Sequence, residues 1–367
     1  MAEMTPMMRQ YLEMKEKHPD SILFFRLGDF YEMFNEDAKL ASKELDLTLT
    51  TRDRNKPEEE RTPMCGVPYH SCDSYIARLI AKGYKVAICE QMEDPALAKG
   101  LVVERDITRI ITPGTVIAAS MLEEGKNNFL CAIYADSAAY GLCLCDISTG
   151  EVFATSLSAA EDAMDHLKNE LGRFHPTEVI LSDGAWQLEG LVDFLRERLD
   201  CLCENGGEAR FRYDVSLSAV KKQFTAGLDT LPEGDTAAVQ AAGGLLSYLY
   251  ETQKTDLSHI SVFSYYTAGH FMELDLTARQ TLELTATMRA QEKKGSLLWV
   301  LDKTRTAMGG RLLRGWMERP LLSPVQIARR QQAVADLVED IITREELTLV
   351  LKEVTDLERL MGRVVYG

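Results

Sequence analysis

The segment Phe30-Tyr31-Glu32 carries the side chains of this sequence that are best suited to recognition chemistry. It follows a Gly28-Asp29 turn and reads as a strand, in which residues two apart share a face. Phe30 and Glu32 therefore project together, while Tyr31 points the other way. A ring beside one hydrogen-bond acceptor suits a probe of DNA bases, because the ring can enter a base stack and the carboxylate can accept an N–H from a displaced base edge. The alternative is an ordinary amphipathic strand, with Phe30 in the core and Glu32 in solvent.

Asp146 supports a second, enzymatic interpretation. It lies on the second strand of a predicted three-strand meander that a helix follows, an order typical of ribonuclease-H-like folds. Nucleases of that fold hold two metal ions between clustered carboxylates, for which Asp136 and Asp183 are the other candidates. The competing interpretation is a strand-terminal aspartate that organises the Ser148-Thr149-Gly150 turn.

Motifs that bind nucleotides are missing from the sequence. Neither G-x-x-x-x-G-K-[ST] nor G-x-G-x-x-G occurs, so we expect no ATP hydrolysis and no cofactor in this chain. The six histidines are scattered. The C-x-C pairs Cys143/Cys145 and Cys201/Cys203 do not have the C-x2-C spacing of structural zinc sites, so we expect no bound metal. The eight cysteines are expected to be reduced and mostly packed as small apolar side chains.

Length and composition indicate an acidic protein of two or three domains, since 367 residues exceed one compact core. No apolar stretch approaches the ~20 residues that span a bilayer. The N-terminus lacks a secretory pattern, so we expect a cytoplasmic protein without membrane contact. A net charge of −16 opposes phosphate binding, but −12 of it falls on residues 113–254. The charge therefore neither supports nor excludes DNA as a ligand.

Three patterns follow one another along the chain. In the first, Thr5 and Pro6 begin a helix that His18-Pro19 ends. The other elements expected there are strands at 22–27, 30–34, 47–51 and 84–90, helices at 35–45 and 72–82, and a charged loop at 52–61. The second pattern has a meander of strands at 129–135, 140–147 and 151–155, then a helix at 158–171, a strand at 178–181 and a helix at 186–199.

The third pattern is helical from about residue 236. Ser323-Pro324 begins one helix, and capping boxes are predicted at Thr343/Glu346 and at Thr355/Glu358. The helical pattern continues to Gly367 without a closing element, which we interpret as a truncation. We expect a multidomain protein in which two α/β domains precede an incomplete all-α domain.

Seven stretches of the sequence resemble the bacterial MutS mismatch-recognition family. They are residues 5–8 (TPMM), 24–34 (FFRLGDFYEMF), 63–70 (PMCGVPYH), 87–91 (AICEQ), 111–115 (ITPGT), 146–150 (DISTG) and 356–359 (DLER). The stretches are collinear from near the N-terminus to the last residues, so chance similarity is a poor explanation.

The resemblance implies a mixed α/β mismatch-recognition domain over residues 1–115 and a ribonuclease-H-like connector domain without nuclease activity over 125–250. An incomplete helical core and lever domain over 255–367 follows. Phe30 and Glu32 match the Phe-x-Glu motif of the family, in which the Phe stacks on a mispaired base from the minor groove and the Glu hydrogen-bonds to it. Arg52 and Arg105 fall where the family carries basic residues near the DNA.

The resemblance also implies partners. These are double-stranded DNA with mismatches or small insertion/deletion loops, a second copy in the full-length parent, and a MutL-type protein that binds through the connector. The clamp and the C-terminal ATPase domain of the family, which binds ATP and Mg²⁺, are missing, so this chain is not expected to be an enzyme. One alternative is a MutS-like paralogue with another DNA task, although such paralogues generally lack the Phe-x-Glu pair. The other is a metal-dependent nuclease that uses Asp146.

Overall fold

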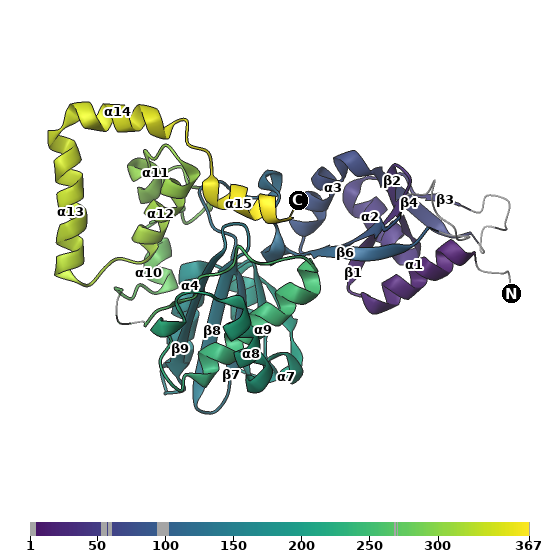
Figure 1. Ribbon diagram of the computed structural model, residues 1–367, viewed down its shortest axis with the longest axis horizontal. Helices are drawn as coiled ribbons and strands as arrows, with labels where there is room; N and C mark the ends of the chain where they lie inside the picture. The colour runs from purple at the N-terminus through teal and green to yellow at the C-terminus, as the bar shows by residue number, and fades with distance from the viewer. Residues whose placement is uncertain are drawn as a thin grey trace. The chain divides into compact units, whose positions relative to one another are not determined.

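The structure is a computed structural model that describes residues 5–52, 57, 61–93, 103–267, 269 and 271–366. The chain divides into two compact units (Figure 1). Unit 1 comprises the described residues of Met1–Met121 together with Leu249–Thr255, and unit 2 comprises those of Leu122–Tyr248 and Asp256–Gly367. The two domains predicted at 125–250 and 255–367 both fall in unit 2, apart from Leu249–Thr255, which belongs to unit 1, so the boundary predicted between them stays a prediction.

Unit 1 is a mixed six-stranded sheet with helices. Its strand order is β3-β4-β2-β1-β5-β6, in which β1 and β5 are parallel and the other neighbours are antiparallel. The elements are α1 (Pro6–Lys17), β1 (Ser21–Leu27), β2 (Phe30–Phe34), α2 (Asn35–Leu45), β3 (Thr50–Thr51), β4 (Pro63–Pro68), α3 (Cys72–Ile80), β5 (Lys85–Gln91) and β6 (Arg105–Ile111). The α/β class predicted for this segment is confirmed.

The first helix begins as its sequence predicts. The Thr5 side chain accepts a hydrogen bond from the Met8 backbone N–H at 3.4 Å, Pro6 occupies the first turn, and His18 is the C-cap residue. Helix α1 covers one face of the sheet through Tyr11, whose ring packs edge-to-face on Phe25 and Phe34 at centroid distances of 5.5 and 5.0 Å. These aromatic contacts fix α1 above the middle of β1 and the end of β2.

One strand prediction in unit 1 needs correction, and two strands of this unit were missed. The strand predicted at 47–51 is only Thr50–Thr51, because these two residues alone pair with β4. Strands β4 and β6 were not predicted. Prolines at both ends of β4 and a glycine within it hide its pattern, and charged residues interrupt the apolar run of β6. Pairing with a neighbouring strand overrides these weak local preferences.

Unit 2 contains a second six-stranded sheet, ordered β11-β10-β7-β8-β9-β12. Its strands are β7 (Leu130–Ala135), β8 (Ala139–Asp146), β9 (Glu151–Ser158), β10 (Glu178–Leu181), β11 (Leu202–Asn205) and β12 (Ser264–Tyr265). Strands β7, β8 and β9 form an antiparallel meander, while β10 runs parallel to β7 and β11 parallel to β10. This is the strand order of ribonuclease-H-like folds, so that fold prediction is confirmed.

Helices make up the rest of unit 2. They include α4 (Ala163–Phe174), α5 (Asp183–Trp186), α6 (Leu191–Asp193), α7 (Gly207–Arg210), α8 (Tyr213–Gln223), most of α9 (Thr236–Gln253), α10 (Leu276–Thr281), α11 (Leu297–Leu301), α12 (Ala307–Glu318), α13 (Pro324–Glu339), α14 (Ile341–Leu351) and α15 (Leu357–Tyr366). The long helix predicted at 186–199 is broken into α5, α6 and a π-helical turn at Phe194–Arg198. Among the described residues, no helix is long and apolar enough to cross a membrane.

Of the three caps predicted in the third pattern, two are wrong and one is right. Ser323 caps α13 as predicted, with Pro324 in the first turn. Helix α14 is capped by Asp340, which accepts from the Thr343 backbone N–H at 3.0 Å, so Thr343 lies inside the helix. At α15, Asp356 rather than Thr355 accepts from a first-turn N–H, that of Arg359, at 3.3 Å. In both cases an aspartate near the predicted threonine is the cap, and aspartate is at least as good a capping residue.

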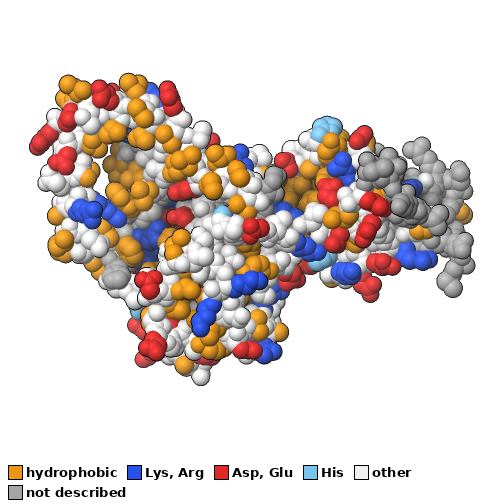
Figure 2. All heavy atoms as spheres, viewed as in Figure 1, with side chains coloured by type: hydrophobic (Ala, Val, Ile, Leu, Met, Phe, Trp, Pro, Cys, Tyr) orange, Lys and Arg blue, Asp and Glu red, His pale blue; other side chains and the backbone are white. Residues whose placement is uncertain are grey.

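Helices α13 and α14 carry an unusual surface. All of their residues are described, and none is buried. Val325, Ile342 and Val350 are exposed by 79, 74 and 64%, and Figure 2 shows hydrophobic side chains along the upper left of the view, where these helices lie. Exposed apolar area of this kind is typical of surfaces that contact other protein.

The packing of α9 on the sheet of unit 2 allows a stability prediction. A Cβ atom at Gly141 in β8 would lie 2.0 Å from the backbone oxygen of Ala237, at the start of α9. Gly141→Ala must therefore move backbone, and we expect it to lower the free energy of unfolding by at least about 1–3 kcal/mol. Chemical denaturation measures this. Gly125→Ala is the matched control, since nothing lies within 4 Å of its Cβ position; equal midpoints for the two variants would contradict the packing described.

Candidate nucleic-acid interface

The site begins at the β1–β2 hairpin, whose turn contains Gly28 with a φ of +59°, a conformation that glycine adopts without strain. In the register of this hairpin, Phe30 is opposite Leu27 and Glu32 is opposite Phe25. Phe30 is 46% exposed, whereas Tyr31 is only 5% exposed. The alternation inferred from the sequence is therefore present, and the alternative in which Phe30 belongs to the core does not hold.

The covering of this face by α1 determines how open each position is. Phe34, at the end of β2, is fully buried beneath Tyr11. Glu32 is intermediate, with 21% of its side chain exposed, and Phe30 lies beyond the cover. The three residues share one face of β2, so the face changes along the strand from core to open surface within four residues. A ring and a carboxylate are thus held side by side at the margin of a rigid core.

The electrostatics of Glu32 reflect this marginal position. Burial raises the pKa of its carboxyl above the ordinary value, and the nearby Arg52 guanidinium opposes the shift. Arg52 Nη1 lies 4.0 Å from Glu32 Oε2, and about half of the Arg52 side chain is exposed. Arg52 Nη1 also lies 3.9 Å from Met7 Sδ. The structure therefore brings together three of the four predicted site residues.

The opposite face of β2 is anchored by Tyr31. Its hydroxyl donates to Glu90 on β5, and its ring packs near Phe24 at a centroid distance of 5.9 Å. The guanidinium of Arg26 lies near the Tyr31 ring at 5.6 Å and over the Tyr69 ring at 3.6 Å. Burial and the Glu90 carboxylate raise the pKa of Tyr31, so its hydroxyl remains a donor. This anchor fixes the strand from behind and leaves its other face for contact.

Arg105, the fourth predicted residue, is placed differently. It is 7% exposed, and its Nε donates to the Arg26 backbone oxygen at 2.8 Å. Its Nη1 donates to Gln10 Oε1 at 3.1 Å and to the Val103 backbone oxygen at 3.0 Å. Its guanidinium also lies 5.0 Å from the ring of Phe25. Because the Nε and Nη1 donors of Arg105 already have partners within the fold, we leave this residue out of the proposed DNA contacts.

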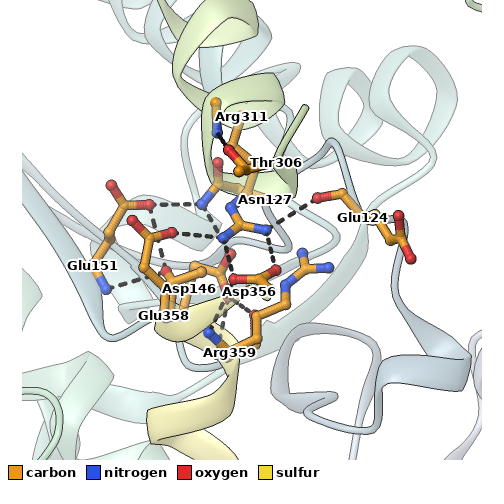
Figure 3. A network of polar contacts seen from close by, with 12 residues as sticks. Glu124, Asn127, Asp146, Glu151, Thr306, Arg311, Asp356, Glu358 and Arg359 are labelled. Atoms are coloured by element: carbon orange, nitrogen blue, oxygen red, sulfur yellow. Dashed lines mark hydrogen bonds and ion pairs between the residues drawn. The ribbon is translucent and has the colours of Figure 1, made fainter. Parts of the chain in front are cut away.

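Asp146 has the role of a turn organiser (Figure 3). It is fully buried at the end of β8. Its Oδ1 accepts from the Ser148 backbone N–H at 2.9 Å and from Ser148 Oγ at 2.6 Å. Its Oδ2 accepts from Asn127 Nδ2 at 2.9 Å and from the Asn128 backbone N–H at 3.1 Å. Four hydrogen bonds use both oxygens, so the carboxylate is not available to a metal ion.

The strand register separates the other two candidate carboxylates from Asp146. Asp136 comes directly after the last residue of β7. Asp146 lies at the other end of β7, because its neighbour Cys145 pairs with Leu130, the first residue of that strand. Since β7 has six residues, the two ends are roughly 20 Å apart. Asp183 follows β10, which is parallel to β7, so it lies at the Asp136 end. The nuclease alternative therefore has no support in the structure, because the three carboxylates do not form a cluster.

A network of ion pairs and hydrogen bonds joins α12 and α15 to residues 123–126, which precede the Asn127 that donates to Asp146 (Figure 3). Arg311 on α12 donates to both oxygens of Asp356 at 2.7 and 2.8 Å and to Glu358 Oε2 at 2.6 Å. Arg359 donates to the backbone oxygens of Glu123 and Lys126 at 2.9 and 2.6 Å. These contacts bind α12 and α15 to residues 123–126. The resemblance singled out DLER, but the sequence did not disclose this partner because Arg311 lies 45 positions from Asp356.

A cavity of about 750 Å³ lies in the same unit, beside α10 and α12. Two of its arginines are paired within the protein: Arg173 Nη1 is 2.9 Å from Glu170 Oε2, and Arg314 Nη1 is 3.4 Å from Glu318 Oε1. Burial raises the pKa of Glu318. In each of these ion pairs the arginine neutralises the charge of a buried or partly buried glutamate. The cavity does not include residues of the site around Phe30.

Comparison with known protein families gives three matches along the chain. The model of MutS domain I matches residues 5–120, that of MutS domain II matches 128–261, and that of MutS domain III matches 277–367. These matches define a protein that contains the first three MutS domains in their family order. The chain belongs to the MutS family.

Curated relatives agree with this assignment. The DNA mismatch repair proteins MutS of Ruminiclostridium cellulolyticum, Acetivibrio thermocellus and Lachnoclostridium phytofermentans are 49, 48 and 45% identical to this chain over its whole length. The chain covers 42, 42 and 39% of those relatives. It thus spans about two fifths of their length.

The hydrogen bonds of Asp146 predict a structural effect without a catalytic one. In Asp146→Asn, an amide NH2 group replaces one carboxylate oxygen. The N–H or O–H groups that donated to that oxygen then face the NH2 group and lose their acceptor. We expect a loss of about 1–3 kcal/mol in the free energy of unfolding, measured by denaturation. Asp183→Asn, at a partly exposed helix start, is the control and should change stability little. Mg²⁺- or Mn²⁺-dependent cleavage of labelled DNA that Asp146→Asn abolished at unchanged stability would refute the structural role.

Proposed function

We propose that this chain binds duplex DNA and probes it for mispaired bases or small insertion/deletion loops. The observation that carries the proposal is the exposed ring of Phe30 beside the half-buried carboxylate of Glu32, on an open sheet face in the segment that matches MutS domain I. The exposed ring of Phe30 has a free face, and a base stack offers it a flat apolar partner.

The two side chains would act in different ways. Phe30 enters the minor groove as a wedge and stacks on a base, which costs least where pairing is already weak. Glu32 accepts a hydrogen bond from the edge of the displaced base. Burial raises the pKa of this carboxyl, and neighbouring phosphates would raise it further. In the protonated form the carbonyl oxygen still accepts from the base, while the repulsion between carboxylate and phosphates is removed. Arg52, beside Glu32 and half exposed, is placed to bind a phosphate and to release Glu32 as it does so.

The remaining functional assignments follow from the family. We propose that the chain itself is not an enzyme, and that ATP and Mg²⁺ are bound by a C-terminal ATPase domain in the full-length parent. We further propose that the parent forms a homodimer and that a MutL-type partner binds to the connector, which corresponds to the ribonuclease-H-like sheet of unit 2. A cytoplasmic location accords with a DNA repair protein of this family.

Removal of the wedge tests the proposal directly. Phe30→Ala should reduce the preference for mismatched over matched duplex by about 1–3 kcal/mol, the value of one base–aromatic stack. The fold should survive, because the ring is 46% exposed. Fluorescence titration with the two duplexes measures the preference. Tyr213→Ala removes a similarly exposed ring from α8 and serves as the control. Loss of thermal stability with unchanged discrimination would mean that Phe30 is structural.

Charge removal at Glu32 gives a second test with a defined sign. Glu32→Gln and Glu32→Ala should both tighten binding to matched DNA, because each removes a carboxylate that repels phosphates. Only Glu32→Gln keeps an acceptor for the base, so it should retain more mismatch binding. Titrations at fixed salt compare the two. Unchanged matched-DNA affinity in both variants would show that Glu32 does not face the duplex.

The pH dependence of stability gives an independent check on Glu32. Its folded pKa is raised, so the native state favours the proton and the carboxyl destabilises the fold increasingly as the pH rises through that pKa. Glu32→Gln should therefore raise Tm at pH 7. The penalty builds up between the ordinary carboxyl pKa of the unfolded chain and the raised folded pKa, so the difference from the unsubstituted chain should vanish only as the pH falls below the ordinary value.

A further inference from the structure

Gly66 on β4 lies directly opposite Glu32 in the strand register, and opposite residues in an antiparallel pair share a face. We propose that Gly66 determines specificity: its missing side chain keeps the flank of Glu32 open, so that the minor-groove edge of a mispaired nucleotide can reach the carboxylate. This inference rests on the proposed function and adds to it a residue that does not itself recognise a base.

The space beside Glu32, rather than the backbone, makes glycine necessary at this position. Gly66 is not among the glycines with a positive φ. A Cβ atom at Gly66 would lie 3.5 Å from Glu32 Cγ and 3.2 Å from the backbone oxygen of Tyr31. A methyl group there would fill the space beside the stem of the Glu32 side chain at ordinary van der Waals distance, and its tight contact with the Tyr31 backbone oxygen would require β2 and β4 to give by a few tenths of an ångström.

Among the described residues, Glu32 is covered on its β1 side and less covered toward β4. On the β1 side its neighbour is Phe25, which is fully buried, and Phe34 next along β2 is buried beneath α1. On the β4 side the neighbours on the same face are Gly66, without a side chain, and Pro68 opposite Phe30. Both are partly exposed. The approach to Glu32 therefore passes over β4.

The charges along this approach suit a nucleic-acid strand. Arg52 lies within 4.0 Å of the Glu32 carboxylate and is half exposed, so it supplies a cation for a phosphate next to the point where the base edge meets Glu32. Phe30, on the same side of β2, supplies the stacking surface. A glycine among these three side chains allows the sugar of the displaced nucleotide to come close to the protein backbone.

The experiment is a double-mutant cycle on the chain, with matched and mismatched duplexes as probes. Gly66→Ala should lower the preference for mismatched DNA about tenfold, the value of one hydrogen bond to a charged group. In a Glu32→Ala background the same change should have no further effect on that preference, because its route of action has been removed. Gly125→Ala, at an open position, is the matched control and should leave binding unchanged.

The outcomes separate this inference from the function on which it rests. An equal loss of preference from Gly66→Ala in both backgrounds, or equal weakening on both duplexes, would overturn the role assigned to Gly66. Loss of the cooperative thermal transition in Gly66→Ala would overturn it too, since Gly66 would then serve β2–β4 pairing. If Phe30→Ala and Glu32→Ala leave discrimination intact, the proposed function itself fails.

Discussion

The hydrogen-bonded register of β2 between β1 and β4 is the constraint on which the rest of the site depends. It assigns alternate residues to opposite faces, so a slip of one position would bury Phe30 and expose Tyr31. Tyr31 holds the register from one side through its hydrogen bond to Glu90, and Phe34 holds it from the other beneath Tyr11. The open pair Phe30 and Glu32 is thus positioned by residues that touch no ligand.

A rigid support matters for a wedge. A ring that unstacks a base pair must keep its place while the duplex bends, and a mobile ring would instead withdraw. Phe30 stands on a strand with paired neighbours on both sides, close to a packed aromatic cluster. Sites on sheet elements hold geometry better than sites on loops. The same rigidity explains how one missing side chain at Gly66 can control access to Glu32.

Unit 2 has the strand order of ribonuclease-H-like folds without a cluster of carboxylates among its described residues. The strand order is that of ribonuclease-H-like proteins, yet Asp146 spends both oxygens on a turn and on Asn127 and Asn128. The carboxylate that a nuclease would use to bind metal here joins the turn to Asn127 and Asn128. The residues just before them accept hydrogen bonds from Arg359 through the backbone oxygens of Glu123 and Lys126. Function follows the particular side chains, and the topology alone would have suggested the wrong activity.

The sequence by itself determined the class of each segment, the ribonuclease-H-like order of the second sheet, and the facing of Phe30 and Glu32. These rest on local signals: the two-residue period of strands, the caps at Thr5 and Ser323, and motifs that are contiguous in the chain. The tertiary structure decided which residues have partners far away in the sequence. Only the packed fold shows Arg105 buried against Gln10 and Phe25, Arg52 beside Glu32, and Asp136 at the wrong end of the sheet. Spacing along the chain carries no record of these distances, because they arise when separate strands and helices pack together.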